Sequence, residues 1–425
     1  MKLSLKREIG LFGATSYGVG IILGAGIYAL IGPAASIAGN SIWISFIIGA
    51  LISSFTGLSY AELSALFPKA AAEYVYVKRT FENELLAFLT GWLIIFTGAV
   101  SASTVALGFA GYFKALFNSP TILTALALIA LLSFLNFYGI KESSRVNILF
   151  TAVEIVGLLL IIFLGIGRFG EVNYLDTPNV QGIFAAAALM FFAYLGFEDI
   201  VNIAEETKNP QKILPRALIL SILITAIFYV LVALSAVSLA GWKELGASSA
   251  PLAYAASKVL GENAFSVMSY IALFATANTV LIISIVGSRM IYGMAKDGSL
   301  PPILSKVHLK RRTPWIAVIC VMVVSMFFVL LGDIELVAGI TSFGVFITFA
   351  FVNLSLIWLR YKKPKLKRPF KAPINIGKFP VIAFLGLVSC ALMVTQFDLN
   401  VVLFGTFVVG LGVIAHRMYK RKIIA

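Results

Sequence analysis

Charged residues are scarce in this sequence. They make up 12% of the 425 residues, whereas a soluble globular protein carries roughly 25%, and hydrophobic residues make up 60%. A chain of this composition has too little polar surface to be an ordinary soluble protein. The sequence therefore predicts a membrane protein that crosses the bilayer many times.

Cysteine and histidine are almost absent. The two cysteines, Cys320 and Cys390, lie in the middle of different apolar segments, which argues against a disulfide framework and against a metal cluster. The two histidines, His308 and His416, lie in or beside basic segments and not in a catalytic arrangement. We therefore expect neither an enzyme nor a bound metal or organic cofactor.

Apolar stretches long enough to cross a bilayer recur about twelve times. Each has about 20 residues, which as a helix span a hydrocarbon core roughly 30 Å thick. They lie near residues 11–37, 42–67, 85–112, 121–140, 146–168, 181–204, 214–240, 264–293, 314–331, 336–359, 379–396 and 399–416. All are predicted to be helices, because they lack the polar alternation of a transmembrane barrel strand.

Lysine and arginine are distributed unevenly between the predicted loops. With the N-terminus inside, four of the 33 basic residues fall in outer loops: Lys114, Arg168, Lys243 and Lys258. This bias predicts a multi-pass protein of the plasma membrane with both termini in the cytoplasm. The net charge of +14 then reflects topology, so nucleic acid is not an expected partner. The basic run 360–378 is predicted to be an inner loop that could touch anionic lipid.

Three glycines, Gly20, Gly24 and Gly26, lie in the middle of the first apolar segment, in the stretch G-I-I-L-G-A-G-I-Y. Glycine costs about 1 kcal/mol in a helix interior relative to alanine, so the helix is weakest here. In a bilayer an opened helix is stable only where its freed backbone groups meet protein, water or a ligand. The alternative is that these glycines only allow close packing of helices.

The sixth apolar segment repeats this pattern. Its stretch F-F-A-Y-L-G-F-E places Gly196 at mid-membrane among aromatic residues and next to an acid, Glu198. Two interrupted helices five segments apart are typical of an inverted repeat with a binding site between the interruptions. We therefore predict breaks near residues 24–26 and 193–197.

Four motifs occur in order along the chain. They are G-I-I-L-G-A-G-I-Y, Y-A-E-L-S-A-L-F-P with a following E-Y-V-Y, F-F-A-Y-L-G-F-E with E-E-T-K-N-P, and S-R-M-I-Y-G-M-A-K-D-G-S-L-P. Together they resemble the amino acid, polyamine and organocation (APC) transporter superfamily. One departure is that Ala71 and Ala72 stand where the family usually has paired glycines.

This resemblance implies an all-α membrane protein of 12 transmembrane helices with the leucine-transporter-like fold. Two inverted five-helix repeats would occupy residues 1–168 and 169–360, and a basic inner loop with helices 11 and 12 would occupy residues 361–425. The implied function is secondary active transport of an amino acid by alternating access. The expected partners are a small-molecule amino acid and the lipid bilayer, and the sequence makes no prediction of oligomeric state.

The opened helices suggest how an amino acid would be held. Backbone N–H groups after the first break would bind the carboxylate, and carbonyl groups before both breaks would accept the ammonium. By resemblance, Phe192 would be an aromatic gate, and small or apolar residues would line the side-chain pocket, which favours neutral substrates. A cationic substrate stays open if Glu198 faces the pocket. The predicted substrate-binding residues are Ile21, Ile22, Gly24, Ala25, Gly26, Gly98, Ala102, Phe192, Leu195 and Gly196.

Glu154 lies deep inside the fifth apolar segment, where an ionised carboxylate costs about 2.5 to 3.5 kcal/mol. By resemblance, it stands where some proton-coupled relatives place a lysine. Protonated Glu154 could donate a hydrogen bond to a helix 1 carbonyl, or ionised Glu154 with Asn278 and Thr279 could bind Na⁺. A third reading is a protonated acid that only bonds a neighbouring helix. We favour H⁺ over Na⁺ as the coupling ion, with Glu198 as a second proton carrier.

The preferred function is thus proton-coupled symport of neutral amino acids. An amino acid exchanger and a sodium-coupled symporter remain open. Of another class, a membrane receptor that senses amino acids or a channel also remains open, although the chain shows no soluble stretch longer than a loop.

Overall fold

The computed structural model describes residues 9–424 except 69–71, 139, 205–206 and 312, and most of this chain is helical. The first half contains α1 (Leu11–Ile22), α2 (Gly26–Ala38), η1 (Gly39–Ser41), α3 (Ile42–Leu66), α4 (Ala72–Phe81), α5 (Glu84–Phe117), α6 (Thr121–Tyr138) and α7 (Ile140–Ile166). The second half contains α8 (Val180–Tyr194), η2 (Phe197–Ile203), α9 (Pro210–Ala247), α10 (Pro251–Leu260), α11 (Glu262–Lys296), η3 (Pro302–Ser305), α12 (Trp315–Val329), α13 (Ile334–Lys362), the short strands β1 (Asn375–Ile376) and β2 (Phe379–Pro380), α14 (Val381–Val394) and α15 (Leu399–Ile424).

Eight helical stretches of the described chain are long and apolar enough to cross a membrane. They are Gly26–Leu66, Glu84–Phe117, Thr121–Tyr138, Val180–Val201, Pro210–Ala247, Glu262–Lys296, Ile334–Lys362 and Leu399–Tyr419. Shorter apolar helices are Leu11–Ile22, Phe150–Ile166, Trp315–Val329 and Val381–Val394. The prediction of an all-helical, multi-pass membrane protein is confirmed. The count of twelve spans, the inverted repeat and the division of the chain at residues 168 and 360 stay predictions.

Helix bounds follow the apolar runs closely, and α3 coincides almost completely with the predicted segment 42–67. The larger differences have local causes. α9 starts early because Pro210 occupies its first turn, where a missing N–H costs nothing. The same helix bends at Gly241, whose φ is +69°, and the following α10 was not predicted because no long apolar run marks it.

The first and sixth apolar segments are both interrupted. α1 ends at Ile22 and α2 begins at Gly26, so residues 23–25 separate two helices. After α8 ends at Tyr194, Gly196 adopts a φ of +113° and the chain continues as the 3-10 helix η2. That backbone conformation is readily available only to glycine.

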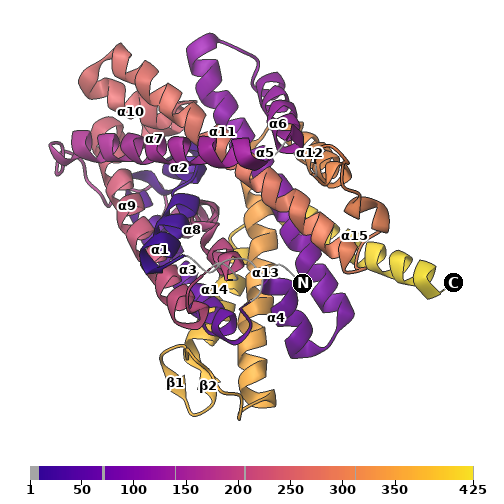
Figure 1. Cartoon of the computed structure of the whole chain (residues 1–425). Helices are drawn as coiled ribbons and strands as arrows, with labels where there is room; N and C mark the ends of the chain where they lie inside the picture. Colours follow the sequence, from indigo (N-terminus) through magenta and orange to yellow (C-terminus); the bar gives the residue numbers. More distant parts are fainter. Residues whose placement is uncertain (1–8, 69–71, 139, 205–206, 312, 425) are drawn as a thin grey trace.

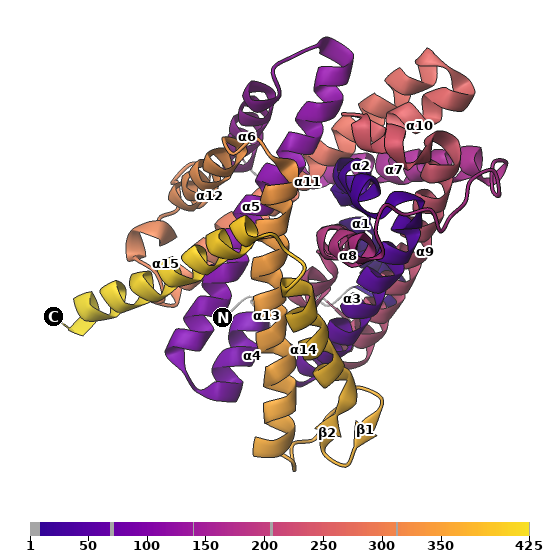
Figure 2. The ribbon, with the colours of Figure 1, turned by 180° about the vertical axis from the view of Figure 1, so that it is seen from behind.

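The two interruptions lie in the centre of the bundle. α2 packs against α8, and α1 packs against η2 and α9. α5 packs against both α11 and α13, which lie on the other side of the interruptions (Figure 1). Seen from behind, the β1–β2 hairpin again projects from the end of α13 and α14 (Figure 2). The interrupted segments therefore lie between α9 on one side and α5, α11 and α13 on the other.

Candidate functional site

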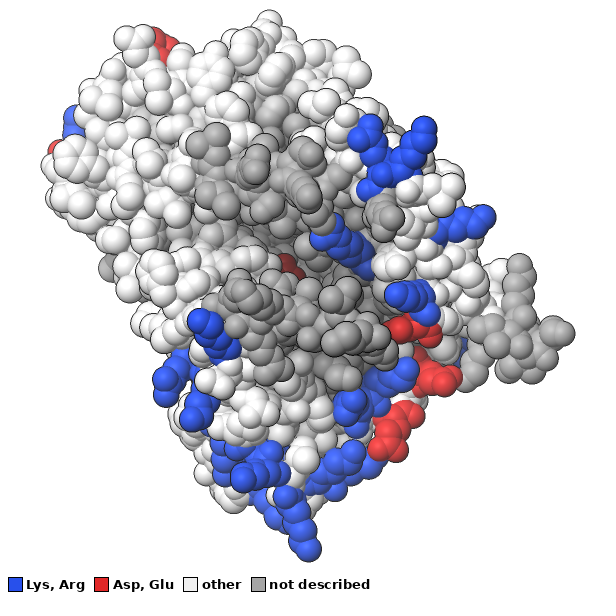
Figure 3. Space-filling model, in the orientation of Figure 1, with Lys and Arg blue, Asp and Glu red and all other residues white. Residues whose placement is uncertain are grey.

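A cavity of about 150 Å³ lies between the two interruptions and the helices α5, α11 and α13. Its wall includes backbone from both interrupted segments and side chains from the three helices. In the space-filling view, the surface is hollowed near its centre and an acidic side chain is visible at depth (Figure 3). Most of the Lys and Arg side chains in this view lie toward the lower and right-hand side of the molecule, which we call the basic face (Figure 3).

The structure brings almost all of the predicted site residues together. Those that line the cavity are Ile21, Ile22, Gly24, Ala25, Gly26, Gly98, Glu154, Phe192, Leu195, Gly196, Glu198, Asn278 and Thr279. Ala102 is the exception, since it is fully buried between helices and is not part of the wall. The lining residues of α5 are Ile94, Thr97, Gly98 and Ser101. At 100° per residue, Ala102 lies about a quarter turn from the centre of that face.

The backbone of the first interruption is held by α11. Ala25 is the N-terminal cap of α2 and has no side chain that could cap it, but its own N–H donates to Oγ1 of Thr279 at 3.1 Å. Thr279 in turn donates its hydroxyl to the carbonyl of Ala275, also at 3.1 Å. A Cβ on Gly24 would lie 3.2 Å from the same Thr279 oxygen, so glycine allows this close approach. Thr279 therefore binds the opened backbone by a hydrogen bond in this conformation.

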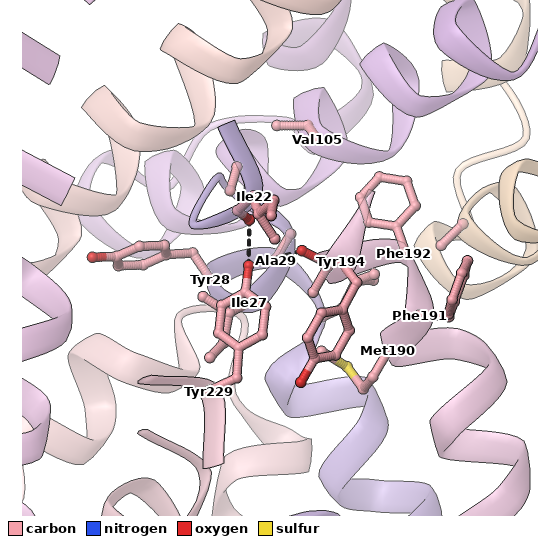
Figure 4. Packing of buried hydrophobic residues seen from close by; sticks show 14 of the residues in the cluster. Ile22, Ile27, Tyr28, Ala29, Val105, Met190, Phe191, Phe192, Tyr194 and Tyr229 are labelled. Atoms are coloured by element: carbon pink, nitrogen blue, oxygen red, sulfur yellow. Dashed lines mark hydrogen bonds between the residues drawn. The ribbon is translucent and has the colours of Figure 1, made fainter. Parts of the chain in front are cut away.

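Tyr229 of α9 joins the two interruptions. Its hydroxyl donates to the carbonyl oxygens of Ile22, at the end of α1, and of Ala193, in the last turn of α8, the latter at 2.8 Å. The contact with Ile22 is visible in the close-up view (Figure 4). The buried ring packs against Phe46 and Tyr194, with centroid distances of 5.4 and 5.2 Å. Sequence reasoning missed Tyr229, because a tyrosine within an apolar helix carries no local signal.

Glu154 of α7 lies beside the first interruption. Its backbone carbonyl accepts a hydrogen bond of 2.7 Å from the hydroxyl of Tyr28, and the carbonyl of Tyr28 accepts one of 3.1 Å from Tyr112. The Glu154 side chain lines the cavity and is 1% exposed. Its Oε1 has no hydrogen-bond partner within the described part of the chain. Such an orphaned buried oxygen marks a place where a proton, an ion or a ligand group can bind.

Three further carboxylates line the cavity: Glu73 of α4 and Glu198 and Asp199 of η2. Oε2 of Glu198 accepts a 2.9 Å hydrogen bond from the N–H of Gly196 and so satisfies a backbone donor of the second interruption. Oε1 of Glu73 accepts a 3.0 Å hydrogen bond from the hydroxyl of Tyr60. Burial, together with the nearby Asp199, raises the pKa of Glu73 to about 7. No Lys, Arg or His is among the described residues that line the cavity.

Glu73, Tyr60 and Asp199 were also missed by sequence reasoning. Glu73 is the first residue of the E-Y-V-Y motif, and Asp199 directly follows Glu198, but neither was assigned to the site. What was lacking was the position of α4, which carries Glu73 to the cavity from a loop between two long helices.

The rest of the wall is largely aliphatic and aromatic. Its apolar side chains are Ile94, Phe192, Ile282, Ile283, Val286, Met290, Val345 and Phe349. Hydroxyl groups from Thr97, Ser101, Thr341 and Thr348 interrupt this surface. The wall can therefore bury an apolar ligand side chain and offers it few hydrogen-bond partners.

Small residues close the bundle on the side of the cavity remote from α4. A Cβ on Gly26 would lie 2.7 Å from the Cα of Ala193, so α2 and α8 are in backbone contact here. A Cβ on Gly108 of α5 would lie 2.5 Å from the Cβ of Ala29. Ile27 and Tyr28 are fully buried. α2 is therefore packed closely against α8 and α5, whereas Glu198 and Asp199 of η2 are partly exposed.

Two opened helices that face one cavity in a multi-pass membrane protein are typical of a transporter site. The family model described as amino acid permease matches residues 9–414 of the chain. The chain belongs to the amino acid permease family. This confirms the resemblance to APC superfamily transporters, and a small-molecule substrate and a membrane location follow from it.

The names of individual relatives give different substrates. The branched-chain amino acid permease BcaP of Bacillus subtilis is 32% identical, over 99% of this chain and 94% of its own length. The methylthioribose transporter of the same organism is 30% identical with the same coverage. The vacuolar cationic amino acid transporter 4 of Arabidopsis thaliana is 30% identical over 85% of this chain and 64% of its own length. All are named as permeases or transporters, and this permease is likewise a transporter and not an enzyme.

Proposed function

We propose that this permease is a proton-coupled symporter of neutral amino acids that works by alternating access. The observation that carries the proposal is the orphaned Oε1 of Glu154, buried in the wall of a cavity built on two interrupted helices. The protein would lie in the plasma membrane with the basic face in the cytoplasm, as the distribution of Lys and Arg favours. The cavity would then lie nearer the cytoplasmic side of the membrane.

The backbone would recognise the groups that all amino acids share. The uncapped N-terminus of α2 offers N–H groups and the positive end of a helix dipole to the substrate carboxylate. The C-terminal ends of α1 and α8 offer carbonyl oxygens to the ammonium, and Tyr229 fixes two of those carbonyls. These contacts depend on no particular side chain of the substrate.

The aliphatic part of the wall would select the side chain. Eight apolar side chains from four helical elements surround this part of the cavity, which suits a branched aliphatic side chain such as that of leucine. The relative named as a branched-chain amino acid permease agrees with this choice.

Glu154 would carry the coupling proton. A protonated carboxyl can donate a hydrogen bond and an ionised one can only accept, so protonation changes what Glu154 can bind in the cavity. A proton and an amino acid that bind to the same conformation favour each other's binding, which is the basis of symport. Sodium is less favoured because one of the two lone pairs of the Thr279 oxygen already accepts a hydrogen bond from the N–H of Ala25.

A cationic substrate is the second candidate, and one observation favours it. Glu73, Glu198 and Asp199 line the cavity without a basic residue among its described lining. A lysine-like side chain directed toward them would replace the missing positive charge. The relative named as a cationic amino acid transporter fits this alternative.

Uptake into proteoliposomes tests the proposal. Labelled leucine should accumulate when the outside is more acidic, without Na⁺, and unlabelled lysine should not compete with it. Glu154→Gln should abolish accumulation, whereas the exposed control Glu171→Gln should behave as the parent. A requirement for Na⁺ with indifference to pH would overturn proton coupling, and strong competition by lysine would overturn the neutral substrate.

Three further outcomes would replace the proposal with another function. Uptake that ignores both gradients but is accelerated by internal amino acid identifies an exchanger. Single-channel currents identify a channel. Binding without flux identifies a receptor, and it can be detected by thermal shift, since a ligand at 100 times its Kd adds about 2.7 kcal/mol of stability.

A further inference from the structure

The chain between α13 and α14 is strongly basic. Residues 362–380, which we call the basic platform, contain Lys362, Lys363, Lys365, Lys367, Arg368, Lys371 and Lys378 and no acidic residue. Lys362 and Lys363 lie 3.5 and 4.0 Å from Oε1 of Glu82. The other lysines of the platform form no ion pair with the rest of the described chain. Lys and Arg crowd the lower end of the molecule, where the β1–β2 hairpin lies in Figure 1 (Figure 3).

A buried acid makes the most extensive polar contacts between the platform and the helices. Glu62 of α3 is fully buried and accepts a 2.8 Å hydrogen bond from the N–H of Ala372, within the platform. It also pairs with Nε of Arg368 at 3.0 Å and with the guanidinium of Arg360 on α13. Nη1 of Arg368 donates to the carbonyl of Leu366 at 2.9 Å. The lysines therefore lie on a segment that is fixed to the helices and not on a free loop.

Two large aliphatic side chains project from the platform. Ile374 is 63% exposed and Ile376 is 74% exposed, on the hairpin formed by β1 and β2. Ile374 also has a φ of +54°, which is unusual for a β-branched residue. Lys371 and Lys378 flank the two isoleucines in the chain. Apolar side chains beside cationic ones match the boundary between lipid headgroups and acyl chains.

The neighbouring helices place the hairpin near that boundary. α14 has 14 residues, which rise about 21 Å at 1.5 Å per residue and fall short of a hydrocarbon core about 30 Å thick. The hairpin joins directly to the start of α14 at Val381. Trp358 and Tyr361, in the last turns of α13, are 50% and 55% exposed, as expected of aromatic residues at a membrane interface.

We propose that the basic platform binds the headgroups of anionic phospholipids in the leaflet on the basic face, with Ile374 and Ile376 inserted among the first acyl carbons. The unpaired lysines supply the attraction to phosphate, and the two isoleucines restrict it to phosphate carried by a lipid. Because Glu62 holds the platform against α3 and α13, bound lipid is tied to the helices that line the cavity.

Native mass spectrometry of the purified full chain in uncharged detergent tests this site. Phosphatidylglycerol and phosphatidylcholine with identical acyl chains are titrated separately. The parent chain should retain phosphatidylglycerol preferentially. The variant K365Q/K367Q/K371Q/K378Q should bind it at least tenfold more weakly, because one basic residue near a membrane surface contributes about fivefold in affinity. I374S/I376S should weaken retention without removing the headgroup preference.

The matched control is K114Q/K243Q, which removes two exposed lysines from outside the basic platform. It should retain lipid as the parent does. Equal retention of the two lipids by the parent, or unchanged retention by the fourfold lysine variant, would overturn the proposal. So would displacement of phosphatidylglycerol by inorganic phosphate but not by chloride at equal ionic strength, because the site would then recognise free phosphate. None of these readouts depends on transport, so they stand whether or not coupling to protons is found.

Discussion

Glu62 and Arg360 form a bidentate ion pair, with Nε bonded to Oε1 at 2.7 Å and Nη2 to Oε2 at 2.5 Å, across 298 positions of the sequence. Both side chains are buried, at 0% and 4% exposure. The pair connects the end of α3 to the end of α13, and Arg368 joins it from the basic platform. One carboxylate thus serves two guanidinium groups, which makes it difficult to replace.

Glu62→Gln should destabilise the protein strongly. The variant leaves the charges of Arg360 and Arg368 without their counter-ion, and breaking a buried pair in this way costs about 3 to 5 kcal/mol. Thermal unfolding in detergent measures the effect. Glu82→Gln is the control, because its pair with Lys362 is largely exposed and surface pairs contribute little. Equal unfolding midpoints for the two variants would contradict the prediction.

Tyr229→Phe should remove the hydrogen bonds that hold the backbone at both interruptions. Phenylalanine keeps the packing against Phe46 and Tyr194 but removes the donor to the carbonyls of Ile22 and Ala193. Leaving buried carbonyls without a partner costs about 1 to 3 kcal/mol. We expect a lower unfolding midpoint and a raised KM for uptake. A change in midpoint with an unaltered KM would show that Tyr229 is structural only.

Gly26→Ala and Gly98→Ala form a matched pair. A Cβ at Gly26 would lie 2.7 Å from the Cα of Ala193, so alanine should force α2 and α8 apart and lower the unfolding midpoint. A Cβ at Gly98 would have Ile283 at 3.9 Å as its nearest neighbour, so alanine fits there. Because Gly98 lines the cavity, that variant should retain stability but bind large substrates less well. Identical behaviour of the two variants would contradict this account.

The carboxyl of Glu73 should make the conformation pH-dependent near neutrality. Its pKa is raised from 4.5 to about 7 by burial, so hydration of Glu73 in another conformation would return its pKa toward 4.5. Between these values the buried conformation binds a proton that the hydrated one does not. It should therefore lose about 1.4 kcal/mol for each unit that the pH rises from 4.5 to 7, and nothing more above that.

Substrate exchange at equal internal and external pH measures this dependence without a proton gradient. Glu73→Gln should flatten the pH profile between 4.5 and 7, whereas the exposed control Glu82→Gln should keep it. A profile unchanged by Glu73→Gln would assign the titration to another group.

Much of the fold was predictable because its signals are local. A bilayer requires long apolar helices, so each run of about 20 apolar residues marks one. Gly196 indicates the second interruption in the sequence, because its φ of +113° suits glycine. The residues around Gly196 were expected at the site for that reason. Most predicted site residues therefore lie together in the cavity.

The remaining features depend on the tertiary arrangement. Ser101 and not Ala102 lines the cavity, because the rotation of α5 is set by its packing against α11 and α13. Tyr229 reaches Ile22 across 207 positions, and no pattern around either residue indicates the pairing. Glu73 acquires its importance from the location of α4 beside η2, which a short loop sequence cannot specify.

The packing of Gly26 on Ala193 and of Gly108 on Ala29 makes the two ends of the cavity energetically unlike. Separating these small residues breaks only dispersion contacts, which neither salt nor protons alter. The opposite end contains Glu73, Glu198 and Asp199, whose mutual repulsion depends on both. Ionic strength and pH therefore act on the contacts among these acids and leave the contacts between the small residues unchanged, so the inward and outward rates of the permease should respond differently to the same change of buffer.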